Sequence, residues 1–345
     1  MSLVLLAPAS LSDLVAESRL PMHLPHLEAL AAAGRIARID ASAESWLCAQ
    51  LGVEDESTPV AALRLASETP DGGEARSGYW LCADPIAATA GINSVRIDGV
   101  PDDLTMQQAQ ALCASLSAFF AQDGLQMVAA AASRWYVRAN AAQRIATVPL
   151  WRATGRSMLD HLAIGADAPV WRTRLNEAQM LMHEHPVNRE REASGLAPVA
   201  GVWWWGGGAW PAFGAAAVDR VIGGPRWIAA ACAANRIAWL ANDAEPASML
   251  SSAGERTLAI IGDEWGRSAT APDVLAQWDA RHFAPLRTAL EAGVLDRATL
   301  LLPWDAGLLR IDIDAARRRP WQRWFGGGRT APAPSLSVSL KGFVR

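Results

Sequence analysis

The segment from Asn188 to Gly208 gathers residue types that could bind an anion. Asn188 and Arg191 are spaced i, i+3, so on a helix they would share one face and offer side-chain donors. The apolar run Trp203–Trp205 ends in glycines, and a strand that feeds a glycine turn leaves backbone N–H groups open to a ligand. We therefore expect an anion site formed by Asn188, Arg191, Trp205, Gly206, Gly207 and Gly208. The alternative is a glycine-rich turn beside a tryptophan-lined core.

Three carboxylates follow apolar runs that we predict to be buried strands. Asp263 and Glu264 follow 257–262, and Asp305 follows 298–302. Ligands of α/β proteins lie outside the carboxyl ends of strands, so these acids could hold one metal ion or act as a general base. No histidine accompanies them, and we assign no metal site.

Histidines and cysteines offer no other site. His183 and His185 are spaced i, i+2, which points them about 200° apart on a helix, so they cannot chelate one ion from regular helix geometry. A solvated helix end is the alternative. Cys48, Cys82, Cys113 and Cys232 form no C-x-x-C pair and indicate neither a zinc site nor a disulfide framework.

Strands interleaved with helices must position these residues, and this order is typical of an α/β fold with a layered, mostly parallel sheet core. We expect strands at 3–6, 79–83, 94–98, 135–138, 202–205, 257–262 and 298–302, and helices at 105–120, 171–185 and 272–290. We place the core at 1–66 and 195–329, an inserted α+β section at 67–194 and a loosely ordered tail at 330–345.

Composition excludes several classes of protein. The chain has 345 residues, 51% hydrophobic and 19% charged, which is not the composition of a disordered chain. A net charge of −4 argues against a nucleic-acid binder. The N-terminus has no basic segment before its apolar run, and the uncharged stretch 193–218 contains six glycines and two prolines, so we expect no signal peptide, no membrane span and a cytoplasmic location.

Several motifs resemble known families. The block around Asn188, Arg191 and the glycines is similar to archaeal-type, cofactor-independent phosphoglycerate mutases of the alkaline phosphatase superfamily. From Leu3 to about Phe325 the chain more closely resembles the bacterial RpfE-type regulatory proteins, which are phosphoglycerate-mutase-like. The motifs are Ala83-Asp84-Pro85, Arg134-Trp135-Tyr136, the run 175–181 and the Trp-Gly-Gly-Gly block.

The resemblance implies an alkaline-phosphatase-like core, but this chain departs from the mutases where they hold two metals. Residues 7–10 lack the Asp of the first metal-binding turn, 262–267 lack a His, and 303–307 lack the Asp-His pair. Leu196 and Ala200 replace the usual Lys and Asn.

We therefore expect a catalytically inactive mutase-like protein with a regulatory or ligand-binding role. It would use no cofactor and would bind a small anionic metabolite or a protein partner. One alternative is a metal-dependent phosphomonoesterase or phosphomutase with relocated ligands. Another is a tryptophan-rich protein-interaction module.

Overall fold

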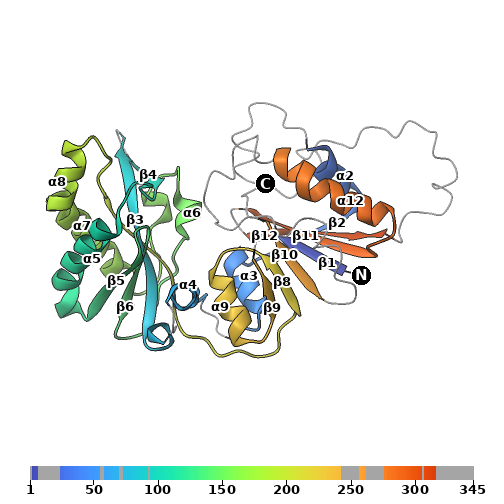
Figure 1. The fold of residues 1–345 in the computed structure, drawn as a ribbon, viewed down its shortest axis with the longest axis horizontal. Helices are drawn as coiled ribbons and strands as arrows, with labels where there is room; N and C mark the ends of the chain where they lie inside the picture. Colours follow the sequence, from blue (N-terminus) through green and yellow to red (C-terminus); the bar gives the residue numbers. More distant parts are fainter. Residues whose placement is uncertain are drawn as a thin grey trace. The chain divides into compact units, whose positions relative to one another are not determined.

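A computed structural model describes residues 2–6, 24–54, 58–69, 73–91, 94–241, 256–261, 276–304 and 307–315. The chain forms two compact units (Figure 1). Unit 1 comprises 1–52, 214–225 and 232–345, and unit 2 comprises 53–213 and 226–231. The sequence-based boundaries at 67 and 194 thus both fall within unit 2, and the proposed tail at 330–345 lies outside the described residues.

Unit 1 contains a seven-stranded sheet in the order β2-β12-β11-β1-β10-β8-β9. The strand β1 lies between β10 and β11 and runs parallel to both, with Leu6 aligned with Ile260 and Leu301. Among the described strands of this sheet, the antiparallel pairs are β11 with β12 and β12 with β2. The expected layered, mostly parallel sheet is therefore confirmed. Its strands are β1 (Ser2–Leu6), β2 (Arg35–Ile39), β8 (Arg220–Gly223), β9 (Ala238–Leu240), β10 (Thr257–Ile260), β11 (Arg297–Trp304) and β12 (Gly307–Asp314).

The helices α2 (Pro25–Ala33) and α12 (Ala284–Glu291) cover one face of this sheet (Figure 1). Their apolar side chains pack with Leu3, Leu5 and Leu300 in one core cluster. The N-terminus of α2 is capped from a distance, because the buried carboxylate of Asp279 accepts the Leu27 N–H at 2.8 Å. Asp279 begins a π-helical turn, Asp279–Phe283, that leads into α12. Two further helices are α3 (Ala43–Gln50) and α9 (Trp227–Ala234).

Unit 2 is built on an antiparallel sheet whose central strand is β3. It pairs with β4, β6 and β7, while β6 also pairs with β5. The expected hairpin neighbour at 94–98 is confirmed as β4. The strand that we expected in the parallel core at 202–205 belongs instead to β7 and pairs antiparallel to β3. The strands are β3 (Tyr79–Ala90), β4 (Val95–Gly99), β5 (Leu125–Ala131), β6 (Arg134–Ala139) and β7 (Gly201–Ala209).

Helices cover both faces of the unit 2 sheet. Trp204 contacts Trp171 of α7, whereas the next residue of the strand, Trp205, contacts Arg64 of α4. Successive strand residues point to opposite faces, so α7 and α4 lie on opposite sides. The helix α5 begins with the expected cap, Thr105. The helices are α4 (Val60–Glu68), α5 (Met106–Phe120), α6 (Leu150–Ala153), α7 (Ala168–His183) and α8 (Pro186–Ala193), with 3-10 turns at Glu74–Arg76, Ala121–Asp123 and Leu159–His161.

Within the described residues, none of the helices has the length and apolar character needed to cross a membrane.

Candidate functional site

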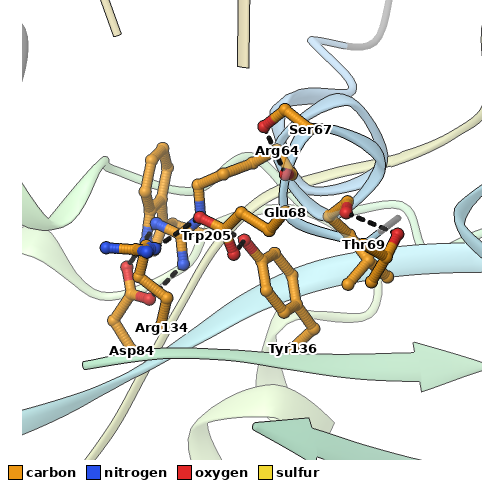
Figure 2. A network of polar contacts seen from close by, with 9 residues as sticks. Arg64, Ser67, Glu68, Thr69, Asp84, Arg134, Tyr136 and Trp205 are labelled. Carbon is orange, nitrogen blue, oxygen red and sulfur yellow. Dashed lines mark hydrogen bonds and ion pairs between the residues drawn. The ribbon is translucent and has the colours of Figure 1, made fainter. Parts of the chain in front are cut away.

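A charged network lies between α4 and the unit 2 sheet (Figure 2). Arg64 of α4 is at its centre. Its Nη1 donates to Asp84 Oδ2 at 2.9 Å, its Nη2 donates to Asp84 Oδ1, and its Nε donates to the hydroxyl of Tyr136 at 2.7 Å. The indole Nε1 of Trp205 donates to Asp84 Oδ2 at 2.7 Å. One carboxylate on β3 therefore accepts hydrogen bonds from both α4 and β7.

The network continues from Tyr136 to the end of α4. The Tyr136 hydroxyl donates to Glu68 Oε2 at 2.6 Å, and Glu68 forms an ion pair with Arg134. Burial raises the pKa of Tyr136 well above its usual range, so its hydroxyl keeps the proton that it donates. Two cations and two anions thus alternate, and their formal charges cancel.

This network is better suited to holding α4 against the sheet than to chemistry. The Arg64 guanidinium lies 4.9 Å from the Tyr136 ring centre and 5.4 Å from that of Trp205, within the range of cation–π contacts. The Asp84 carboxylate, with a side chain 5% exposed, accepts three hydrogen bonds and leaves little capacity for a ligand. Trp205, expected in an anion site, is committed to this network.

The sequence motifs described above contain only part of this network. Asp84, Arg134 and Tyr136 occur in the motifs that carry the family resemblance, whereas Arg64 and Glu68 lie outside those motifs. The i, i+4 spacing of Arg64 and Glu68 on the apolar helix 60–68 is the sequence signal for this pair, because it places a cation and an anion on one face.

Asn188 and Arg191 both lie in α8 and are both buried. The Asn188 Nδ2 donates to the carbonyl oxygens of Met182 at 2.8 Å and Val199 at 2.9 Å, while its Oδ1 accepts the Val199 N–H at 2.8 Å. The amide thus pairs with Val199 as a neighbouring strand would. Its polar atoms serve the backbone of the segment that leads into β7.

The donors of Arg191 are also directed to the protein itself. Its Nε donates to Ala197 O at 2.9 Å, its Nη1 to Gln108 Oε1 at 3.0 Å, and its Nη2 to Asp103 Oδ1 at 2.6 Å. The hydrogen bond from Arg191 lowers the pKa of Asp103. Arg191 therefore ties α8 to the start of α5 and to the segment that Asn188 holds.

The glycines after Trp205 do not form the expected turn, because they continue strand β7. The pairing with β3 shifts between Trp205 and Gly208, and Gly206 adopts a φ of 64° there. A Cβ on Gly206 would lie 3.1 Å from Cβ of Val60, and one on Gly207 would lie 2.5 Å from the hydroxyl of Tyr79. The glycines allow a β-bulge and close packing against α4 and β3.

These contacts do not bring the six expected anion ligands together. Asn188 and Arg191 hold the segment just before Gly201, where β7 begins. From Gly201 to Gly206 the extended strand covers roughly 16 Å at about 3.3 Å per residue. The Gly206 N–H donates to Thr147 Oγ1 at 3.2 Å. The expected residues therefore fall into separate structural clusters along β7.

His185 and Ser115 form a pair that resembles a base and a nucleophile. The ring Nε2 lies 2.9 Å from Ser115 Oγ, while Nδ1 accepts the Val187 N–H at 3.2 Å. Because Nδ1 must carry a lone pair to accept that hydrogen bond, the neutral ring is protonated at Nε2. Nε2 then donates to Ser115 and cannot act as its base. His185 caps α8, and burial lowers its pKa.

The three acidic candidates Asp263, Glu264 and Asp305 lie outside the described residues. In the part of the chain that is described, His, Cys, Asp and Glu side chains form no group of three or more that could hold a metal ion. The four cysteines are buried and carry free thiols. We therefore derive no metal-dependent step from the described side chains.

Comparison with known proteins links part of the chain to phosphoglycerate mutases. No family model matches it. A stretch of 57 residues, 16% of the chain, is 42% identical to a 2,3-bisphosphoglycerate-independent phosphoglycerate mutase of Methanothrix thermoacetophila, and it spans 14% of that protein's length.

Two solved structures are similar over most of the chain. The cofactor-independent phosphoglycerate mutase from Thermoplasma acidophilum has a TM-score of 0.40 and 14% identity, with 99% of this chain and 98% of that chain covered. The PH0037 protein from Pyrococcus horikoshii has a TM-score of 0.47 and 11% identity, with 99% and 92% covered.

Proposed function

We propose that this chain is an RpfE-type, phosphoglycerate-mutase-like regulatory protein of the bacterial cytoplasm that binds a small anionic metabolite or a protein partner and does not transfer phosphoryl groups. The observation that carries this proposal is the sequence that follows β1. The strand ends at Leu6, and the next residues are Ala7, Pro8, Ala9 and Ser10.

The position of β1 in the sheet makes the residues that follow it informative. Its neighbours β10 and β11 are both parallel to it, and a sheet of this kind binds ligands beyond the carboxyl ends of its strands. Metal-dependent phosphoryl transfer needs carboxylate or imidazole ligands for its metals. Residues 7–10 contain neither group, which supports a role in binding over catalysis.

A metal-dependent phosphomonoesterase or phosphomutase is the second candidate. It is favoured by the placement of the remaining acids in the sequence: Asp263 and Glu264 follow β10, and Asp305 follows β11. These are the two strands that flank β1, so relocated ligands would belong to neighbouring strand ends.

A tryptophan-rich interaction module has less support. The tryptophans whose side-chain burial the structure describes, a set that does not include Trp304, are buried or half-buried, and the largest fully buried side chains include Trp80, Trp135 and Trp171. Interface hot spots need tryptophans that a partner can reach.

The deciding experiment pairs metal analysis of the purified protein with assays on phosphoglycerate and a generic phosphomonoester, supplemented with manganese or zinc. The proposal expects no turnover under any of these conditions. It also expects 3-phosphoglycerate, used as the probe anion, to raise the thermal midpoint. Turnover that is lost in Asp263→Asn but kept in Asp219→Asn, a surface control, would overturn the binding role in favour of the second candidate.

A further inference from the structure

The helix α8 is attached to unit 2 mainly by polar contacts. Its buried side chains are Asn188 and Arg191, which form hydrogen bonds with the flanking backbone and with the start of α5. The apolar residues of the helix are exposed or half-buried, namely Pro186, Val187 and Ala193. Elements that bury little apolar surface open locally at a lower cost in free energy than the core does. The helix α8 is therefore suited to detach while the sheet of unit 2 stays folded.

His185 fixes the N-terminal end of α8. Its ring Nδ1 accepts the Val187 N–H at 3.2 Å, and its Nε2 lies 2.9 Å from Ser115 Oγ on α5. A second proton on the ring would have to bind to Nδ1, because the neutral ring already carries one on Nε2. The Nδ1–H group would then face the Val187 N–H, and two donors cannot form a hydrogen bond with each other. Protonation of His185 therefore removes the cap of α8.

The surroundings of His185 favour the neutral ring. The positive end of the α8 dipole disfavours an imidazolium at this position. The helix packed against it, α5, contains no charged side chain from 106 to 120. Its titratable and charged neighbours along the chain are exposed, namely His183, Glu184 and Arg189. Burial lowers the pKa of His185 below 6.5, so protons bind more readily once α8 has left its place.

We propose that His185 is an acid-sensitive latch that holds α8 on unit 2 when the ring is neutral and releases it when the ring is protonated. Release of α8 also frees the segment before β7. The Val199 N–H donates to Asn188 Oδ1 at 2.8 Å, so the protection of this amide from hydrogen exchange reports whether α8 is docked. The released fraction should rise by up to about tenfold per pH unit between 6.5 and the pKa of the docked ring.

The experiment measures hydrogen exchange of the full-length protein from about pH 7.5 to about pH 5.5, with each rate corrected for the intrinsic pH dependence of exchange. The protection of the Val199 amide should fall towards acid by up to about tenfold. Low urea concentrations distinguish local release from global unfolding. Release of one helix exposes little surface, so exchange at Val199 should respond weakly to urea. Exchange at Val137, in the central strand β6, requires unfolding of the sheet and should respond strongly.

Two variants test the role of the ring. His185→Asn keeps a good N-cap that does not titrate, so the protection of Val199 should no longer fall in acid. His183→Asn is the matched control, because it removes an exposed imidazole two residues away and should behave as the wild type does. If His185→Asn does not fold, His185→Ser supplies another non-titrating cap.

Three results would overturn the proposal. The first is protection of Val199 that does not vary with pH in the wild type. The second is a pH dependence that persists in the folded His185→Asn or His185→Ser protein. The third is an equal response of Val199 and Val137 to urea, which would show that α8 leaves only when the whole unit unfolds.

Discussion

The guanidinium of Arg191 is fully buried, yet the carboxylate that it binds at 2.6 Å, that of Asp103, is 42% exposed. The cation lies inside unit 2 and its anionic partner lies at the surface. The other two contacts of Arg191, to Gln108 and Ala197, are also within unit 2. Arg191 thus connects α8, the start of α5 and the segment before β7.

Replacing Arg191 by Ala should therefore destabilise the protein directly. Hydrogen bonds to charged groups contribute about 1.5–3 kcal/mol each, so we expect the free energy of unfolding to fall by at least about 2 kcal/mol. Arg189→Ala, which removes an exposed arginine from the same helix, should change it by less than about 0.5 kcal/mol. Urea unfolding measures both. If the Arg191→Ala protein kept wild-type stability but lost phosphoglycerate binding, the result would instead indicate that Arg191 binds the ligand.

The Arg64–Asp84 pair should tolerate joint replacement better than loss of one partner. Asp84→Ala leaves a buried guanidinium without its carboxylate, and breaking such a pair costs about 3–5 kcal/mol. Arg64→Met with Asp84→Leu removes both charges and should recover much of that loss. The exposed pair of Arg287 and Glu291 is the comparison, and Arg287→Ala should cost only about 0.3–0.5 kcal/mol. A double variant no more stable than Asp84→Ala would contradict this interpretation.

Gly206 and Gly195 have similar backbone angles, so comparing them distinguishes the cost of backbone strain from the cost of steric crowding. Gly206 has a φ of 64° and Gly195 a φ of 74°, so alanine costs about 1–2 kcal/mol of backbone strain at either. A Cβ on Gly195 would meet nothing within 4 Å, whereas one on Gly206 would press against Val60. Gly206→Ala should therefore lower the thermal midpoint more than Gly195→Ala does. Equal shifts would show that α4 can move away at no cost.

Acid should weaken the protein partly through His185. Burial lowers the pKa of this ring below its ordinary value of 6.5, so the folded state binds the proton less readily than the unfolded state. The stabilising contribution of the neutral ring is present above pH 6.5 and is lost as pH falls through the lower folded value. Asn is a good N-cap that does not titrate, so His185→Asn should flatten the pH dependence of urea unfolding in this window. If the stability of His185→Asn varied with pH as steeply as that of the wild type, the result would contradict this role of His185.

Local signals in the sequence predict the local elements well. The helix at 105–120 has a capping residue, a Gln three positions later and a regular apolar face, and the structure has α5 at Met106–Phe120 with both halves of the capping box. The hairpin neighbour at 94–98 was likewise recoverable from alternating apolar residues.

The same local signals do not predict which residues distant in sequence pair with one another. The apolar run at 202–205 predicts a buried strand, but a buried strand can be parallel or antiparallel, and its pairing with β3 depends on residues more than a hundred positions earlier. Asn188 and Arg191, spaced i, i+3, both lie on α8 and both donate hydrogen bonds through their side chains. Their acceptors are mainly the backbone of 182–199, which no residue type in the sequence reveals.

The central place of β1 also sets an order for folding during synthesis. Leu3 aligns with Thr257 on one side and Ala298 on the other, so β1 has neither of its partner strands until those later residues have been made. The sheet of unit 2 needs nothing beyond Ala209. Unit 2 can thus complete its sheet first, while the apolar strand β1 stays unpaired in the nascent chain. Pairings this distant in sequence are slow to form. We therefore expect chaperones to matter most while the sheet of unit 1 forms.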